Sequence, residues 1–261
     1  MLKITTILPI LAALAAHAGT DNALQYIASG YDPATGTWRA YKSDIALQIV
    51  HTNGGWSAAQ KYGGPNVVFF DQTPGGPASP FQFPPGSTNT LRQIVAVVLC
   101  EESAGLASLV SADCPLRFTA YPPDTVFDPP GPLDARELPD GFREFAAAIS
   151  VNAQDTNIMK PDLSKLQLLE FTFGADTAAG RVFIGGNAAN PLWRRDWRGG
   201  IAEIVLFPNA LSPREANAVR RLMSVKYALR LRTDPDDGII QVLTNLGMDP
   251  SGLFNTTIMV R

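Results

Sequence analysis

The sequence predicts an all-β protein, a two-sheet antiparallel jelly-roll sandwich with one short C-terminal helix packed at its edge. Glycine and proline supply 22 and 21 of the 261 residues, and such frequent turn residues are typical of many strands joined by loops. Short runs rich in β-branched and aromatic residues recur between these turns. A single amphipathic helix pattern follows the last run, and this order favours two packed sheets with one helix.

Composition narrows the classes of partner. The formal net charge is −3 and 17% of residues are charged, so the chain has no electrostatic basis for binding nucleic acid or an anionic membrane. No internal repeat or charge block divides the sequence. We therefore assign residues 19–230 to one sandwich domain and residues 231–261 to a C-terminal tail.

The first eighteen residues carry the pattern of a secretory signal peptide. Lys3 precedes an apolar segment at residues 4–16. Ala16 and Ala18 are small residues at the two positions that a signal peptidase recognises before its cleavage site. Cleavage after Ala18 would make the protein secreted or exposed on a cell or virion surface. The alternative is that residues 1–18 are retained as a buried N-terminal segment.

The two cysteines, Cys100 and Cys114, lie close together in the sequence. In an exported protein such a pair is most simply a disulfide, and a loop of this size would add roughly 3 kcal/mol of stability. The alternative is two separate buried thiols, since cysteine is often a small core residue.

Eight segments carry a strand pattern of β-branched and aromatic residues between turn residues. They are residues 66–70, 92–100, 106–111, 116–121, 142–152, 166–174, 181–186 and 201–207. Residues 101–105 are predicted to form a hairpin loop between the second and third of these strands. The proline-rich segment at 121–141 lacks many backbone donors, so it is predicted as a surface excursion rather than a strand.

Residues 212–215 read S-P-R-E, which is a capping box with proline at the first helical position. Ala216, Val219, Met223 and Tyr227 then recur at helical spacing and form an apolar stripe. Because a short helix with one apolar face must bury that face, we expect it to cover an edge of the sandwich.

Residues 199–229, GGIAEIVLFPNALSPREANAVRRLMSVKYAL, carry a family resemblance. They resemble the closing segment of the laminin-G-like branch of the concanavalin A-like lectin and glucanase superfamily, where a glycine, an I-A-E-I strand, an A-L-S helix start and a K-Y-G-L-like ending recur together. The segments GPNVVFF-DQ and RVFIGG resemble earlier strands of that family, and the resemblance spans roughly residues 22–230 in order. Gln72 and Ala228 depart from it, each standing where the family has glycine. The resemblance implies a jelly roll and a structural Glu203 that bonds to backbone or to a basic side chain.

No catalytic motif is present in the sequence. Glycoside hydrolysis needs two carboxyl groups about 5–10 Å apart. The enzyme branch of the superfamily that this chain resembles carries such a pair in an E-x-D-x-x-E pattern, which is missing here. G-x-S-x-G is also missing, and His51 is the one histidine left if residues 1–18 are removed. We therefore predict that the chain is not an enzyme, and a divergent glycoside hydrolase or lyase is the least favoured function.

Calcium stays open as a cofactor, because many members of the resembling superfamily bind it through loop carboxylates and carbonyls. Residues 234–238 read DPDDG and cluster three aspartates, but they lack the spacing and distal glutamate of an EF-hand loop. A solvated turn is the favoured interpretation.

The candidate ligand residues are an aromatic and arginine cluster before the last strand, namely Trp193, Arg194 and Arg195, together with Trp56 in a second loop. Arginine and tryptophan side chains can stack on sugar rings or bind the carboxylates of an acidic polysaccharide. Trp193 fits a ligand site and a core position equally well, whereas Trp197 is predicted to fill the core.

Two functions of different class follow. The first is a non-catalytic binding domain, extracellular or on a surface, that recognises a glycan or another surface polymer. The second is a structural role as a virion decoration or fibre protein, or as a cell-surface assembly component. In that role the segment TTIMV at 256–260 would add a strand to a neighbouring copy and so build a homo-oligomer.

Overall fold

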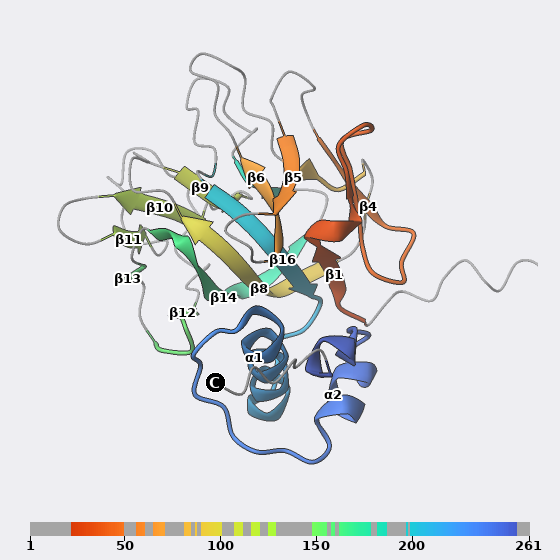
Figure 1. The fold of residues 1–261 in the computed structure, drawn as a ribbon, viewed down its shortest axis with the longest axis vertical. Coiled ribbons are helices and arrows are strands. Elements are labelled where there is room, and N and C mark those ends of the chain that lie inside the picture. The colour runs from red at the N-terminus through yellow and green to blue at the C-terminus, as the bar shows by residue number, and fades with distance from the viewer. Residues whose placement is uncertain are drawn as a thin grey trace, which may run out of the picture.

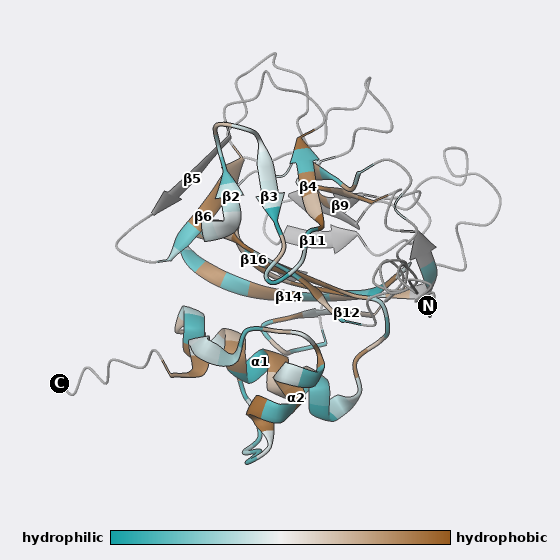
Figure 2. Cartoon of the chain, turned by 90° about the vertical axis from the view of Figure 1, so that its right-hand side faces the viewer, coloured by the Kyte–Doolittle hydropathy of each residue, from teal (hydrophilic) through white to brown (hydrophobic). Residues whose placement is uncertain are grey.

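Two antiparallel sheets stack face to face, and two helices cover the outer face of one of them (Figures 1 and 2). The computed structural model describes residues 22–49, 56–60, 65–70, 81–84, 87, 90–100, 107–111, 116–120, 125–128, 148–155, 158–159, 162–178, 182–186, 197 and 199–254. The predicted all-β sandwich is therefore confirmed.

The first sheet has seven strands, and the second has nine. The first runs in the order β12 (Ala148–Val151), β14 (Asp162–Ala178), β8 (Thr90–Cys100), β16 (Gly199–Phe207), β6 (Asn66–Phe70) and β5 (Trp56–Gln60), with β1 (Leu24–Ile27) also paired to β16. The second runs in the order β13 (Ile158–Met159), β11 (Thr125–Asp128), β10 (Leu116–Ala120), β9 (Ala107–Ser111), β15 (Phe183–Ile184), β7 (Phe81–Gln82), β4 (Ala46–Ile49), β3 (Thr37–Arg39) and β2 (Tyr31–Asp32).

The main core lies between the two sheets. Ile94, Ala96 and Val98 of β8 point into it, opposite Trp38 and Phe81 of the second sheet. The Trp38 and Phe81 rings meet edge to face with their centroids 5.3 Å apart, and Trp38 Nε1 donates a hydrogen bond of 2.8 Å to the carbonyl of Ile27. The indole is therefore buried with its polar atom satisfied.

The outer face of the first sheet holds a second core. Val95, Val97 and Leu99 of β8 alternate with the inward residues and pack under α1 (Pro213–Tyr227), α2 (Ile239–Asn245) and the 3-10 turn η4 (Pro250–Leu253). A strand covered on both faces has no solvent-facing side, so its sequence is a continuous apolar run rather than an alternating one. This explains why residues 92–100 are the strongest strand signal in the chain.

The sequence predicted a helix at the edge of the sandwich. In the structure α1 lies over the outer face of the first sheet instead. Val219, Leu222 and Met223 of α1 pack on the central strands, because those strands carry apolar side chains on their outer face too. The segment assigned as a tail belongs to the same core, since Ile239 and Leu243 of α2 are buried there. Residues 231–254 contain no strand, and TTIMV lies outside the described residues, so its added strand stays a prediction.

Two other local predictions were wrong. β9 pairs with β10 and β15 in the second sheet and not with β8, so residues 101–106 connect the two sheets instead of closing a hairpin. β11 lies inside the proline-rich segment and pairs with β10. Its four residues, TVFD, lie between two Pro-Pro pairs and contain no proline. Each of them therefore keeps its backbone N–H and can pair with a neighbouring strand.

The capping box of α1 is confirmed. The Glu215 amide donates to Ser212 Oγ at 3.4 Å, and the Ser212 amide donates to Glu215 Oε2 at 2.7 Å. The helix ends at Ala228, which adopts a left-handed conformation with φ of 52°. Within the part of the chain that is described, neither helix has the length and apolar character needed to span a membrane.

Candidate functional site

The residues predicted to bind a ligand fall mostly beyond the described part of the chain. Trp193, Arg194, Arg195 and Cys114 lie outside the described residues. Trp56 is the first residue of the edge strand β5 rather than part of a loop, and its side chain is not among those described. Cys100 is buried in the main core, and its disulfide with Cys114 stays a prediction.

The strand register nevertheless brings two of these regions to one end of the first sheet. Trp56 pairs with Phe70, Phe70 pairs with Gly199, and Gly199 pairs with Cys100. Because neighbouring strands lie about 4.8 Å apart, the backbones of Trp56 and Gly199 are roughly 10 Å from each other. In the sequence, β16 begins four residues after Arg195, the last residue of the predicted cluster. We call this edge the Gly199 end of the sheet.

Glycine is required at the start of β16. Gly199 has φ of 139°, and a Cβ there would lie 2.1 Å from the carbonyl oxygen of Leu99. Trp197, two residues earlier, is fully buried, and its amide donates to the carbonyl of Gly185 at 3.0 Å. The prediction that Trp197 fills the core is thus confirmed, and it anchors the chain where β16 begins.

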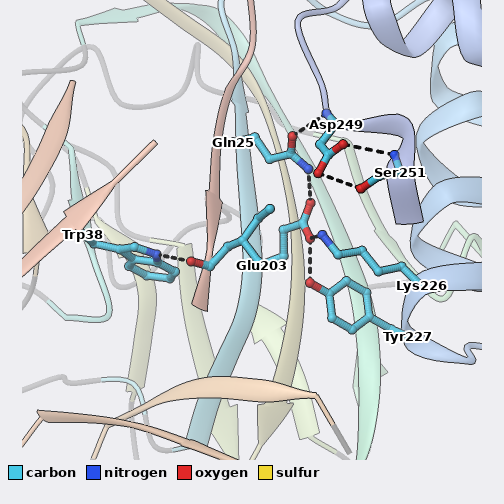
Figure 3. A network of polar contacts seen from close by, with 8 residues as sticks. Gln25, Trp38, Glu203, Lys226, Tyr227, Asp249 and Ser251 are labelled. Carbon is cyan, nitrogen blue, oxygen red and sulfur yellow. Dashed lines mark hydrogen bonds and ion pairs between the residues drawn. The ribbon is translucent and has the colours of Figure 1, made fainter. Parts of the chain in front are cut away.

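Glu203 is the centre of a buried polar network under α1 (Figure 3). The register of β16 against β8 shifts between Ile201 and Glu203, so Ala202 and Glu203 both lie opposite Val97. Such a β-bulge puts two successive residues on the same face and re-aims a side chain. Here it directs the carboxylate outward, toward the helix.

Three donors hold the Glu203 carboxylate, each at 2.5 Å. Gln25 Nε2 donates to Oε1, and both Lys226 Nζ and the Tyr227 hydroxyl donate to Oε2. Burial, together with the charge of Glu203, raises the pKa of the Tyr227 hydroxyl, which therefore keeps its proton and donates. Gln25 Oε1 in turn accepts from the Asp249 amide at 2.8 Å, which ties the turn after α2 to the sheet. The structural role expected for Glu203 is confirmed.

Glu170 of β14 is the second buried carboxylate on this face. Nε of Arg220 in α1 donates to both carboxylate oxygens of Glu170, at 3.0 Å to Oε1 and 2.9 Å to Oε2. The hydroxyl of Ser150 in β12 donates to Oε2 at 2.9 Å. Glu170 and Glu203 therefore each fix one point of α1 to the sheet. Both are paired with a cation and covered by the helix, and neither is placed to meet a substrate.

The acidic turn at 234–238 is occupied by protein groups. Arg214 binds both carboxylate oxygens of Asp236, at 2.8 and 3.0 Å, and the Gly238 amide donates to the same carboxylate at 2.8 Å. These contacts lower the pKa of Asp236 to about 2. Across the described residues, no group of three or more metal-ligating side chains converges.

A groove of about 840 Å³ lies on the outer face of the first sheet, just beyond the last turn of α1. Its floor includes Val67 of β6 and Leu99 of β8, and one wall is the chain that follows the helix. Leu99 pairs with Gly200, so the groove lies close to the Gly199 end. We call it the Leu99 groove. Its lining residues are Pro65, Val67, Leu99, Asn152, Gln154, Leu163, Ser164, Lys165, Leu166, Tyr227, Ala228, Leu229, Arg230 and Leu231.

Sequence reasoning missed the groove and most partners of Glu203. The K-Y pair at 226–227 was visible as part of the family resemblance, but Gln25 lies 178 residues from Glu203 and gave no local signal. The groove combines residues from three strands and a post-helix segment, so no single stretch of sequence encodes it.

Comparisons with protein-family models and with curated protein sequences found no match for this chain.

Proposed function

We propose that this chain is a non-catalytic binding domain, secreted or displayed on a cell or virion surface, that recognises a glycan or another surface polymer. The observation that carries the proposal is the strand register at the Gly199 end. It puts the start of β5, at Trp56, two strands from the start of β16, which the Trp193, Arg194 and Arg195 cluster immediately precedes. Aromatic and arginine side chains from two segments can then act on one ligand.

The two buried glutamates give no support to a catalytic function. A glycoside hydrolase needs two acidic groups facing the substrate across a water-accessible site. Glu170 and Glu203 are instead buried beneath α1, and each is neutralised by a basic residue of that helix. A hydrolase or lyase function gains no support from them.

Glycan-array binding tests the proposal. The intact protein is applied to acidic and neutral glycans beside an Arg194→Ala/Arg195→Ala variant and an Arg232→Ala control, which removes an exposed arginine that is not part of the predicted cluster. We expect binding that the double variant weakens roughly tenfold or more and that the control retains. Uniform silence across both classes of glycan would contradict the proposal.

A structural role in a virion or cell-surface assembly is the second candidate. It is favoured by Ile240 and Phe254, the two large apolar side chains that are exposed among the described residues, at 44% and 67%. Both lie in the C-terminal segment, and Phe254 directly precedes the undescribed residues 255–261. Exposed apolar side chains of this kind can mark an interaction surface. Mass photometry of the intact chain tests the role, and a strict monomer at micromolar concentration would rule it out.

A further inference from the structure

The Leu99 groove has an aliphatic lining. Among the described residues that line it there is no tryptophan or phenylalanine, and the larger aliphatic side chains come from four parts of the chain: Val67, Leu99, Leu163, Leu166, Leu229 and Leu231. The groove lies beyond Tyr227, where α1 ends. Val67 and Leu99 at its floor are buried, and the four leucines of its walls are partly buried. Its volume, about 840 Å³, falls within the range of about 300–1,000 Å³ that is usual for small-molecule sites.

Both walls of the groove are held in place by protein contacts. On one side, residues 163–166 of β14 loop out opposite Leu99, since β14 pairs Asp162 with Cys100 and next pairs Gln167 with Val98. On the other side, the Leu229 amide donates to the Ser224 carbonyl at 3.0 Å, and Ser224 Oγ donates to the Leu229 carbonyl at 2.6 Å. The groove is therefore formed before any ligand arrives.

The charged groups along the groove all have one sign. Among the described residues, Lys165 and Arg230 line it and no aspartate or glutamate does, in a chain whose net charge is −3. Lys165 Nζ already lies 2.9 Å from Asp162 Oδ2. Arg230 is exposed and makes no ion pair with any described residue, so its guanidinium is available to an anion.

We propose that the Leu99 groove binds a single long-chain alkyl carboxylate, with its hydrocarbon chain against the leucines and its carboxylate at Arg230. Aliphatic side chains offer apolar surface to an alkyl chain at a gain of about 0.8 kcal/mol per buried methylene. A guanidinium binds a carboxylate through two parallel hydrogen bonds. This proposal does not depend on the glycan site proposed above.

The shape and chemistry of the groove favour this ligand over two others. A bilayer surface cannot enter a depression between two walls, whereas one acyl chain can. A sugar ring is bound best by an aromatic face, and the lining offers Tyr227, whose hydroxyl is engaged by Glu203. A monomeric carboxylate uses both the leucines and the cation.

The test measures the affinity of the intact protein for octanoate, decanoate and dodecanoate by isothermal titration calorimetry, below their aggregation concentrations. Each methylene should tighten binding roughly fourfold until the groove is filled. Decanol should bind about tenfold more weakly than decanoate, because it lacks the charge that Arg230 recognises.

Arg230→Ala should remove that preference, so that decanoate and decanol bind equally, while Arg232→Ala should preserve it. Both arginines are exposed and two residues apart, so the pair is matched for folding. The inference is overturned if affinity does not depend on chain length, or if Arg230→Ala leaves the preference intact. Binding to anionic vesicles or to oligouronate but not to decanoate would overturn it too. None of these results bears on the loop residues tested by the glycan array.

Discussion

At the scale of single residues, Glu203 shows how a carboxylate is tolerated inside a sheet. It is fully buried, yet its two oxygens receive three hydrogen bonds, one of them from a lysine. A buried charge with such partners adds little net stability, but removing one partner leaves the other buried and uncompensated. The role of this network is to fix where α1 lies on the sheet.

Glu203→Leu should therefore destabilise the protein by about 3–5 kcal/mol. The substitution leaves Lys226, whose side chain is 19% exposed, without its counter-ion and leaves Gln25 Nε2 without its acceptor. Urea denaturation followed by circular dichroism measures the change.

The matched control is Asp176→Ala. Asp176 pairs with Arg92 at 3.7 Å, and its side chain is 75% exposed, so the loss should be below about 1 kcal/mol. Equal effects of the two substitutions would show that the Glu203 network does not hold the helix.

Asp236 makes stability depend on pH in the acid range. The hydrogen bonds from Arg214 and Gly238 lower the pKa of Asp236 to about 2, below its unfolded value of about 3.9. Its stabilising contribution is thus fully present above about pH 4 and is lost as the pH falls through about 2. We expect Asp236→Asn to be less stable than the parent at neutral pH, with the difference closing between pH 4 and pH 2. Denaturation midpoints across this range measure it, and a difference that does not change with pH would refute the assignment.

The family resemblance predicted a structural role for Glu203 but not its surroundings. A carboxylate in an apolar strand needs a partner, and the structure supplies Lys226 and Tyr227. The β-bulge at Ala202 and the long-range contact with Gln25 could not be predicted, because both depend on how strands align in three dimensions.

At the scale of elements, α1 was the most predictable part of the chain, because its signals are local. The capping box and the apolar spacing lie between Ser212 and Tyr227 and describe the helix as observed. Its face against the sheet was not predicted. α1 packs on this face because strands β8, β14 and β16 carry apolar side chains on both sides. The sequence of one strand does not tell whether one or both of its sides are buried.

Ala228→Gly should stabilise the protein by about 0.5–1 kcal/mol. Ala228 caps α1 in the left-handed region, and this conformation costs a residue with a Cβ about 1–2 kcal/mol. Glycine removes that cost, but its greater entropy in the unfolded chain offsets part of the gain in stability. Thermal unfolding measures the shift. The same substitution at Ala218, in the helix interior, should instead cost about 1 kcal/mol or more. A destabilising Ala228→Gly would contradict the strain assigned to this cap.

Short strands marked the limit of sequence reasoning. β2, β3 and β7 have two or three residues each, too few to show a period-two pattern. β9 was identified as a strand but assigned to the wrong neighbour, because the length of the connecting segment does not say whether the chain turns back or crosses to the other sheet.

At the scale of the whole molecule, three layers share two cores. The strands β8, β14 and β16 form the middle layer, with the second sheet on one side and the C-terminal helical segment on the other (Figure 2). The third layer is thus part of the fold, and residues 231–254 contribute buried side chains to it beside those of α1.

A chain that ends at Arg232 should fail to fold cooperatively. It loses the buried side chains of Ile239, Leu243 and Met248, each contributing about 1.5–3 kcal/mol, against a typical total stability of about 5–15 kcal/mol. A chain that ends at Phe254 keeps all three and should unfold like the parent. Circular dichroism and limited proteolysis compare the two, and a fully folded shorter chain would contradict this role for α2.

Residue-resolved hydrogen exchange tests most directly whether the sandwich and the C-terminal helices form one cooperative unit pinned by buried carboxylates. If they do, the core amides of α1 and β16 exchange with the same free energy, equal to that of global unfolding. In Glu203→Leu, α1 then opens at a lower free energy than β16. If α1 already exchanges rapidly in the parent protein while β16 stays protected, the helix is a detachable layer and the Glu203 network does not join it to the sheet.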